Sequence, residues 1–287
     1  ELSALWLGML EENRRERLLT DLGYEPPASA LQILEHLQTE LVQQPLAKEG
    51  RQRLDKLMPL LLKAAGNSSA PLITLERISG LIKAINGRAS YLALLLENPG
   101  ILDHLVKLSS ASSLIAAFLA HHPVLLDELL DPRTLYAPPK KKELERELRL
   151  RFEQMPEDLE YQMEALRIFK QVNVLRVAAA DVTEVLPLMR VSDHLSDIAT
   201  IAIEKVLELT WHHLMAKHGR PPGAVNDAPN RRGFAVVAYG KLGGLELGYG
   251  SDLDLVFIHG SSNPNAMTDG EKPVSNEVFY ARLGQRM

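Results

Sequence analysis

Two aspartates, Asp252 and Asp254, stand one residue apart in an otherwise apolar run that ends at Ile258. The alternating pattern of residues 251–258 predicts a β-strand, which places both carboxylates on one face and Leu253 on the other. The two Cα atoms would then lie about 6.5 Å apart, from the rise per residue of a strand. Carboxylates at that spacing repel each other and resist desolvation, and a divalent cation bound between them removes both costs. Mg²⁺ suits the pair, because it takes oxygen ligands and is usually completed by water and substrate phosphates.

A glycine-rich turn stands upstream of the aspartates. The apolar, β-branched run Phe234–Tyr239 predicts a buried strand, and Gly240–Gly244 follows it directly. Glycines let the backbone approach a ligand closely and can present N–H groups to phosphate oxygens. A lone pair of aspartates at this spacing is more often the solvated face of an edge strand. The preceding strand and the glycines instead favour a phosphate turn followed by two metal carboxylates.

The pair Gly243-Gly244 followed by Ser251-Asp252-Leu253-Asp254 resembles the signature of the polymerase-β-like nucleotidyltransferases. The longer string GKLGGLELGYGSDLDLVF is similar to that of the glutamine synthetase adenylyltransferase family, whose bifunctional members add AMP to glutamine synthetase and remove it. This string is closer to the carboxy-terminal, adenylylating half of that family than to the adenylyl-removing half. Residues 157–182 and 191–197 also resemble the family, so the resemblance extends over nearly the whole chain.

The resemblance implies Mg²⁺-dependent transfer of AMP from ATP to a tyrosine hydroxyl of glutamine synthetase, which regulates nitrogen assimilation, with pyrophosphate leaving. Asp252 and Asp254 are the implied catalytic residues and would hold Mg²⁺ against the α- and β-phosphates. The residues implied to seat the triphosphate are Gly243, Gly244, Ser251 and, as a point charge that can equally be structural, Lys241. A PII-type regulatory protein is the second implied partner, beside glutamine synthetase.

The family pattern also needs a third carboxylate, on a later strand within a Val-Asp-x-Arg-Leu-Arg-Pro stretch, and this sequence has no such stretch. Asp269 and Glu271 are poor substitutes, because they stand in a polar loop and not on an alternating strand. The sequence begins with Glu1 and ends within a helical pattern, which indicates a fragment. We therefore expect the chain alone to have an incomplete metal site and to be inactive by itself.

The rest of the chain supplies the elements that must position this segment. Residues 1–220 are rich in helix-forming residues, and apolar side chains recur every three or four positions. This pattern predicts a succession of α-helices. Three X-Pro pairs each predict the end of one helix and the start of the next: Asn98-Pro99, His122-Pro123 and Asp131-Pro132. Residues 221–232 predict a polar linker, and residues 233–287 the amino-terminal, truncated part of a catalytic domain. The predicted fold class is mainly α, a large helical region followed by the start of a mixed α/β polymerase-β-like nucleotidyltransferase domain.

Composition limits the function classes. The 287 residues carry 46% hydrophobic and 24% charged side chains, which is typical of a soluble globular protein. The net charge of −5 argues against nucleic acid as the main partner, and no apolar run has the length of a membrane span. The absence of cysteine excludes disulfides and thiolate metal sites and fits a reducing, cytoplasmic location. A Walker P-loop, a G-x-S-x-G motif and histidines at zinc-chelating spacing are absent as well.

Two other functions fit the same residues. The first is the reverse direction, in which phosphate attacks the AMP–tyrosine bond in the adenylyl-removing half and ADP leaves. Release of ADP on addition of orthophosphate distinguishes it. The second is a non-catalytic helical docking or regulatory module whose nucleotidyl motif is a remnant. Partner binding that survives Asp252→Ala and Asp254→Ala, without nucleotide binding by the wild type, would favour that module.

Overall fold

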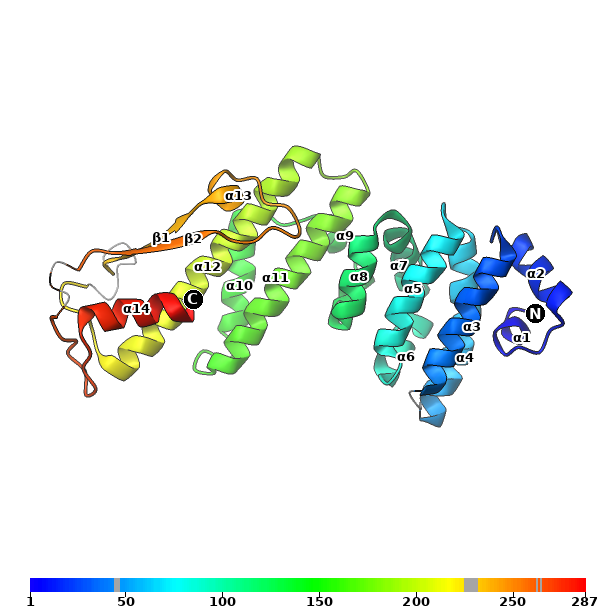
Figure 1. Cartoon of the computed structure of the whole chain (residues 1–287), viewed down its shortest axis with the longest axis horizontal. Helices are drawn as coiled ribbons and strands as arrows, with labels where there is room; N and C mark the ends of the chain where they lie inside the picture. Colours follow the sequence, from blue (N-terminus) through cyan, green and yellow to red (C-terminus); the bar gives the residue numbers. More distant parts are fainter. Residues whose placement is uncertain (44–46, 225–231, 262, 264) are drawn as a thin grey trace. The chain divides into compact units, whose positions relative to one another are not determined.

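The computed structural model of the chain describes residues 1–43, 47–224, 232–261, 263 and 265–287. These residues are mainly helical, which confirms the predicted fold class, and they contain one pair of strands (Figure 1). In chain order the elements are α1 (Leu2–Trp6), α2 (Glu12–Asp21), α3 (Pro27–Gln43), α4 (Lys48–Gly66), α5 (Pro71–Ile85), α6 (Ala89–Glu97), α7 (Pro99–Ala111), α8 (Ser113–His121), the 3₁₀ helix η1 (Pro123–Leu130), α9 (Pro132–Leu135), α10 (Lys141–Phe152), α11 (Leu159–Val182), α12 (Leu188–His218), β1 (Phe234–Ala238), α13 (Gly240–Gly243), β2 (Leu255–His259) and α14 (Asn276–Arg286).

The chain divides into two compact units. The first comprises Glu1–Ala137 with Ala178–Val185, and the second comprises Pro138–Val177 with Leu186–Met287. The predicted ranges 1–220 and 233–287 follow a different division, because side chains from the end of α12 and from α14 share one hydrophobic cluster. Most of the predicted linker, residues 225–231, lies outside the described residues. The three predicted ranges therefore stay a prediction.

Prolines set the helix starts of the first unit. Helices α5, α7, α9 and η1 each begin at a proline, whose missing N–H costs nothing at the first helical position. Three of these starts confirm the predicted boundaries. At α9 the Asp131 carboxylate adds a cap, accepting the N–H of Arg133 at 3.0 Å.

No single helix in the described part of the chain is long and apolar enough to cross a bilayer. Helices α8 and η1 have the required length and apolar character only when they are counted together, and the chain bends by 114° at the break between them.

In the second unit, α10, α11 and α12 form the layer on which the glycine-rich segment rests (Figure 1). Their shared core contains Leu144, Leu148 and Phe152 of α10, Ala165, Phe169 and Val177 of α11, and Val191, Leu195, Ile198 and Ile201 of α12. Leu242 and Leu247 belong to the same core, each with only 4% of its surface exposed. Burial of a leucine side chain contributes about 1.5–3 kcal/mol. These two leucines therefore anchor both ends of the segment that leads from the glycines toward the aspartates.

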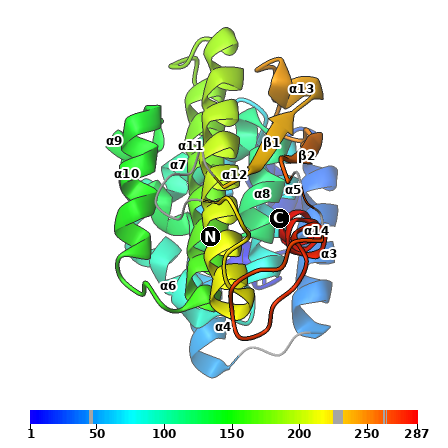
Figure 2. The same ribbon diagram turned by 90° about the vertical axis from the view of Figure 1, so that its left-hand side faces the viewer.

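Strands β1 and β2 form an antiparallel hairpin that pairs Phe234 with His259 at its far end. One face of the hairpin packs on α14, where the rings of Phe234 and His259 stack on Tyr280 at centroid distances of 6.1 and 5.1 Å. The Tyr280 hydroxyl donates to the Arg232 carbonyl at 2.8 Å, and burial raises the pKa of this phenol. Figure 2 shows α14 beside the hairpin, so this helix supports the two strands whose connection contains the aspartates.

Helix α14 is in turn fastened to the end of α12. The rings of Trp211 and Phe279 meet edge to face at 5.4 Å. His218 donates its Nδ1–H to the Lys272 carbonyl at 2.7 Å, and Arg282 donates to His218 Nε2 at 3.0 Å. Because a guanidinium only donates, Nε2 must accept, which fixes the neutral tautomer with its hydrogen on Nδ1. The hairpin thus rests on α14, and α14 rests on α12.

Two glycines after α12 allow a matched test of the packing between the end of α12 and the segment that leads to α14. Gly219 and Gly223 both have positive φ, +80° and +85°. A Cβ on Gly219 would lie 2.0 Å from the Gly270 nitrogen, whereas a Cβ on Gly223 would meet no atom within 4 Å. We expect Gly219→Ala to destabilise the chain by roughly 2–6 kcal/mol, from backbone strain plus overpacking, and Gly223→Ala by about 1–2 kcal/mol from strain alone. Urea unfolding followed by circular dichroism measures both; equal losses would contradict the close packing of Gly219 on Gly270.

Candidate functional site

The structure places Asp252 and Asp254 in the connection between β1 and β2, directly before β2, where both side chains are exposed. The predicted start of their strand at Ser251 is wrong, because β2 begins at Leu255 and the two aspartates precede it. Pairing reaches one residue beyond the strand, since the Tyr239 N–H donates to the Asp254 carbonyl at 2.8 Å. The pairing ends there because the segment after β1 turns into α13. Among the described residues, no strand therefore faces Asp252.

Gly240 is the site residue that the sequence analysis did not single out. Its φ is +54°, and a Cβ at this position would lie 2.2 Å from Oδ2 of Asp254. The carboxylate of Asp254 therefore packs against a bare Cα, in space that any other residue would fill. A signal for this role exists in the sequence, because Gly240 is the first residue after the apolar run of β1, where the chain must turn.

Gly243 and Gly244 have a structural role in the turn. Their N–H groups donate to the carbonyls of Tyr239 and Gly240, each at 3.0 Å, and so close the single turn of α13. A Cβ on Gly243 would lie 2.6 Å from the Ala238 carbonyl oxygen, so only glycine allows α13 to pack this closely on the end of β1. The N–H groups of Gly243 and Gly244, which the sequence predicts as donors to phosphate, thus form hydrogen bonds within the turn. The part that these glycines play toward a ligand stays a prediction.

The turn ends in a strained residue. Leu245 has a φ of +57°, the left-handed conformation that normally selects glycine, and 59% of its surface is exposed. The N–H of Leu245 donates to the Leu242 carbonyl at 3.1 Å, and the N–H of Glu246 donates to the Lys241 carbonyl at 2.7 Å. This pair of bonds is the Schellman arrangement of helix ends. The exposed side chain of Lys241 therefore stands on a rigid turn whose carbonyls are satisfied.

Ser251 closes a second turn, directly before the aspartates. Its Oγ accepts the Gly248 N–H at 2.9 Å, and its own N–H donates to the Gly248 carbonyl at 3.1 Å. Since the hydroxyl oxygen accepts here, the hydroxyl hydrogen can be donated to another acceptor such as a phosphate oxygen. The hydroxyl is half-buried and fixed one residue before Asp252.

Asp252 and Asp254 supply two carboxylates without a third. Among the described residues, no three His, Cys, Asp or Glu side chains gather in a way that could hold a metal ion. Asp269 lies at the end of α12, where its Oδ1 accepts the N–H of Arg220 at 2.5 Å. An exposed carboxylate pair can bind a hydrated cation that takes its other oxygen ligands from water or phosphate.

The sequence of the chain matches one family among known proteins. The family model described as "Glutamate-ammonia ligase adenylyltransferase" matches residues 102–287. The chain is 48% identical over 287 residues to the "Bifunctional glutamine synthetase adenylyltransferase/adenylyl-removing enzyme" of Thioalkalivibrio sulfidiphilus, and 48% identical to the protein of that name from Nitrosococcus oceani. The Pseudomonas putida protein of the same name is 46% identical over 291 residues. Each match covers 100% of this chain, which spans 30%, 30% and 29% of the respective relatives.

The packing of Asp254 on Gly240 gives a direct prediction. In Gly240→Ala, the new methyl group occupies the position of Oδ2 and must displace the Asp254 carboxylate. The positive φ adds a loss of stability of about 1–2 kcal/mol. The ¹³C chemical shift of the Asp254 carboxyl carbon should change in this variant and stay constant in Gly250→Ala, where a Cβ would meet no atom within 4 Å. An unchanged Asp254 signal in Gly240→Ala would refute the contact.

Proposed function

The chain belongs to the glutamate-ammonia ligase adenylyltransferase family, and we propose that its hairpin and glycine-rich turn form part of a centre that transfers AMP from ATP to a tyrosine hydroxyl of glutamine synthetase. The observation that supports this most is the acidic pair in the connection between β1 and β2, with Asp254 held against Gly240. The pair is exposed to ligands, yet the turn that precedes it is held by Leu242 and Leu247, which are buried in the core of the second unit. Catalytic groups on such a rigid support keep their geometry when substrate binds.

Asp252 and Asp254 are the proposed metal ligands. Their donor chemistry fits Mg²⁺, which prefers carboxylate oxygens and keeps several waters when few protein ligands are present. Mg²⁺ at this position would neutralise charge on the α- and β-phosphates during the transfer. The third carboxylate of the family pattern is proposed to come from residues that this chain does not include, since none of the described residues adds a third carboxylate to the pair.

The surrounding turn is proposed to hold the triphosphate. Ser251 would donate its hydroxyl hydrogen to a phosphate oxygen, and Lys241 would add an exposed positive charge from α13. Gly244 would contribute space, because its bare Cα lets a phosphate approach, whereas Gly243 would contribute the close packing of the turn on β1. Gly240 joins this set as the residue that positions Asp254. A PII-type regulatory protein is a further proposed partner through family membership, and no residue of the described chain is assigned to it.

The test uses a protein that carries this chain at the length of its relatives. With Mg²⁺, ATP labelled at the α-phosphate and unmodified glutamine synthetase, we expect labelled AMP on a tyrosine of glutamine synthetase. Asp252→Asn and Asp254→Asn should each lower this rate about a hundredfold or more, which corresponds to ~3 kcal/mol of lost transition-state stabilisation. Glu277→Gln, which neutralises an exposed carboxylate at the start of α14 in the same unit, is the control and should keep the rate.

Two results would count against the proposal. Transfer that is insensitive to both asparagine substitutions would remove the acidic pair from the reaction. Release of ADP from adenylylated glutamine synthetase on addition of orthophosphate, lost in the same variants while AMP addition persists, would assign this chain to the adenylyl-removing reaction.

A further inference from the structure

The two faces of the hairpin formed by β1 and β2 differ in what they contact. Phe234, Ala238 and Leu255 pack against the hydrophobic cores of the second unit. Because side chains alternate along a strand, the residues between these positions project from the opposite face. This outer face carries Val256 and Ile258, which are 44% and 53% exposed. The outer face is therefore the side of the hairpin from which a ligand can approach.

Tyr239 extends the outer face by one residue beyond β1. Its backbone is extended, with a φ of −115° and a ψ of −176°, and its N–H donates to the Asp254 carbonyl at 2.8 Å. The bond continues the register in which Ala238 faces Leu255, so Tyr239 and Asp254 stand opposite each other on the outer face. Opposite residues in an antiparallel pair have Cβ atoms about 4.5–5.5 Å apart. The phenol of Tyr239 therefore leaves the hairpin beside Asp254.

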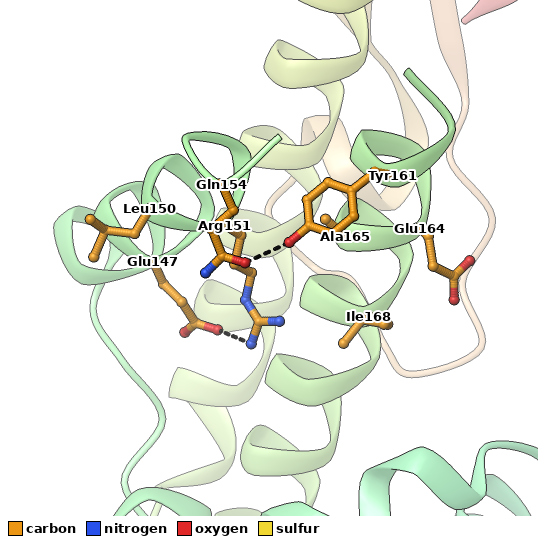
Figure 3. A pocket seen from close by; sticks show the side chains of 8 residues that line it. All are labelled: Glu147, Leu150, Arg151, Gln154, Tyr161, Glu164, Ala165 and Ile168. Carbon is orange, nitrogen blue, oxygen red and sulfur yellow. Dashed lines mark hydrogen bonds and ion pairs between the residues drawn. The ribbon is translucent and has the colours of Figure 1, made fainter. Parts of the chain in front are cut away.

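Tyr239 is also distinct from the other tyrosines of the chain in its exposure. All seven tyrosines lie among the described residues. Tyr239 exposes 56% of its surface, whereas the other six are buried or half-buried: Tyr24, Tyr91, Tyr136, Tyr161, Tyr249 and Tyr280. Figure 3 shows one of these six, Tyr161, whose hydroxyl donates to Gln154 Oε1 at 2.6 Å. The one exposed phenol of the chain thus stands next to the acidic pair.

We infer that Tyr239 is itself an acceptor of AMP, so that the protein modifies its own chain when ATP is present and glutamine synthetase is absent. This inference rests on the proposed function, whose chemistry is transfer of AMP to a tyrosine hydroxyl. The phenol oxygen of Tyr239 attacks the α-phosphorus of ATP, and the bond from that phosphorus to the oxygen that bridges it to the β-phosphorus breaks. Pyrophosphate leaves, and the phenol proton passes to water. A nucleophile that is held beside the reacting group is favoured over one that must diffuse to it.

The test uses a protein that carries this chain at the length of its relatives, with Mg²⁺, ATP labelled at the α-phosphate and no glutamine synthetase. Cleavage with trypsin after Arg232 and Lys241 releases residues 233–241, in which Tyr239 is the only tyrosine. We expect the label, and the added mass of one AMP group, on this peptide. Tyr239→Phe should lose the label. Tyr249→Phe is the matched control and should keep it, since this half-buried tyrosine of the same segment packs against the core.

Asp252→Asn and Asp254→Asn should each lose the label as well, because the same acidic pair serves the reaction. The inference is overturned if AMP is attached to another residue of the chain, or if the label on Tyr239 persists in both asparagine variants. A wild-type protein that labels glutamine synthetase while Tyr239 stays unlabelled overturns this inference alone. A wild-type protein that labels neither overturns the proposed function together with it, so the two failures are distinguishable.

Discussion

The packing of the Asp254 carboxylate against the bare Cα of Gly240 sets the position of the acidic pair relative to the glycine-rich turn. This contact needs a hairpin in register, because the Tyr239 N–H must reach the Asp254 carbonyl just before the chain turns. It also needs a glycine with positive φ at the turn, since any side chain would occupy the place of the carboxylate oxygen. The rest of the second unit serves to hold this geometry in place.

Two sets of contacts support the acidic pair. Leu242 and Leu247 are buried among the side chains of α10, α11 and α12. Tyr280 of α14 stacks on the hairpin, and α14 contacts α12 through Trp211 and His218. The carboxylates remain exposed, so water solvates their charges and folding does not require their desolvation. A turn anchored in the core beside an exposed pair of carboxylates is a suitable arrangement for binding a cation together with a phosphate.

The sequence predicted the parts of this arrangement that local chemistry controls. Helical periodicity and the X-Pro pairs gave the helices and several of their starts, and the apolar runs around Gly240–Gly244 gave the two strands. The start of β2 was misplaced because strand pairing depends on the partner, and the partner leaves the sheet at Gly240. The Gly243 and Gly244 amides bond within a single helical turn, which the low helix propensity of glycine does not predict. The position of Asp269 at the end of α12 depends on long-range folding that no local pattern encodes.

The central claim is that Asp252 and Asp254 bind a divalent cation together with the nucleotide triphosphate, and paramagnetic relaxation tests it on this chain itself. Mn²⁺ takes the same oxygen ligands as Mg²⁺ and broadens NMR signals of nearby nuclei. With Mn²⁺ and ATP present, the account predicts broadening centred on the amides of Gly240, Asp252 and Asp254. Added Mg²⁺ should reverse the broadening, and the double variant Asp252→Asn with Asp254→Asn should not show it. Broadening centred elsewhere on the chain, or equally strong in the double variant, would contradict the account.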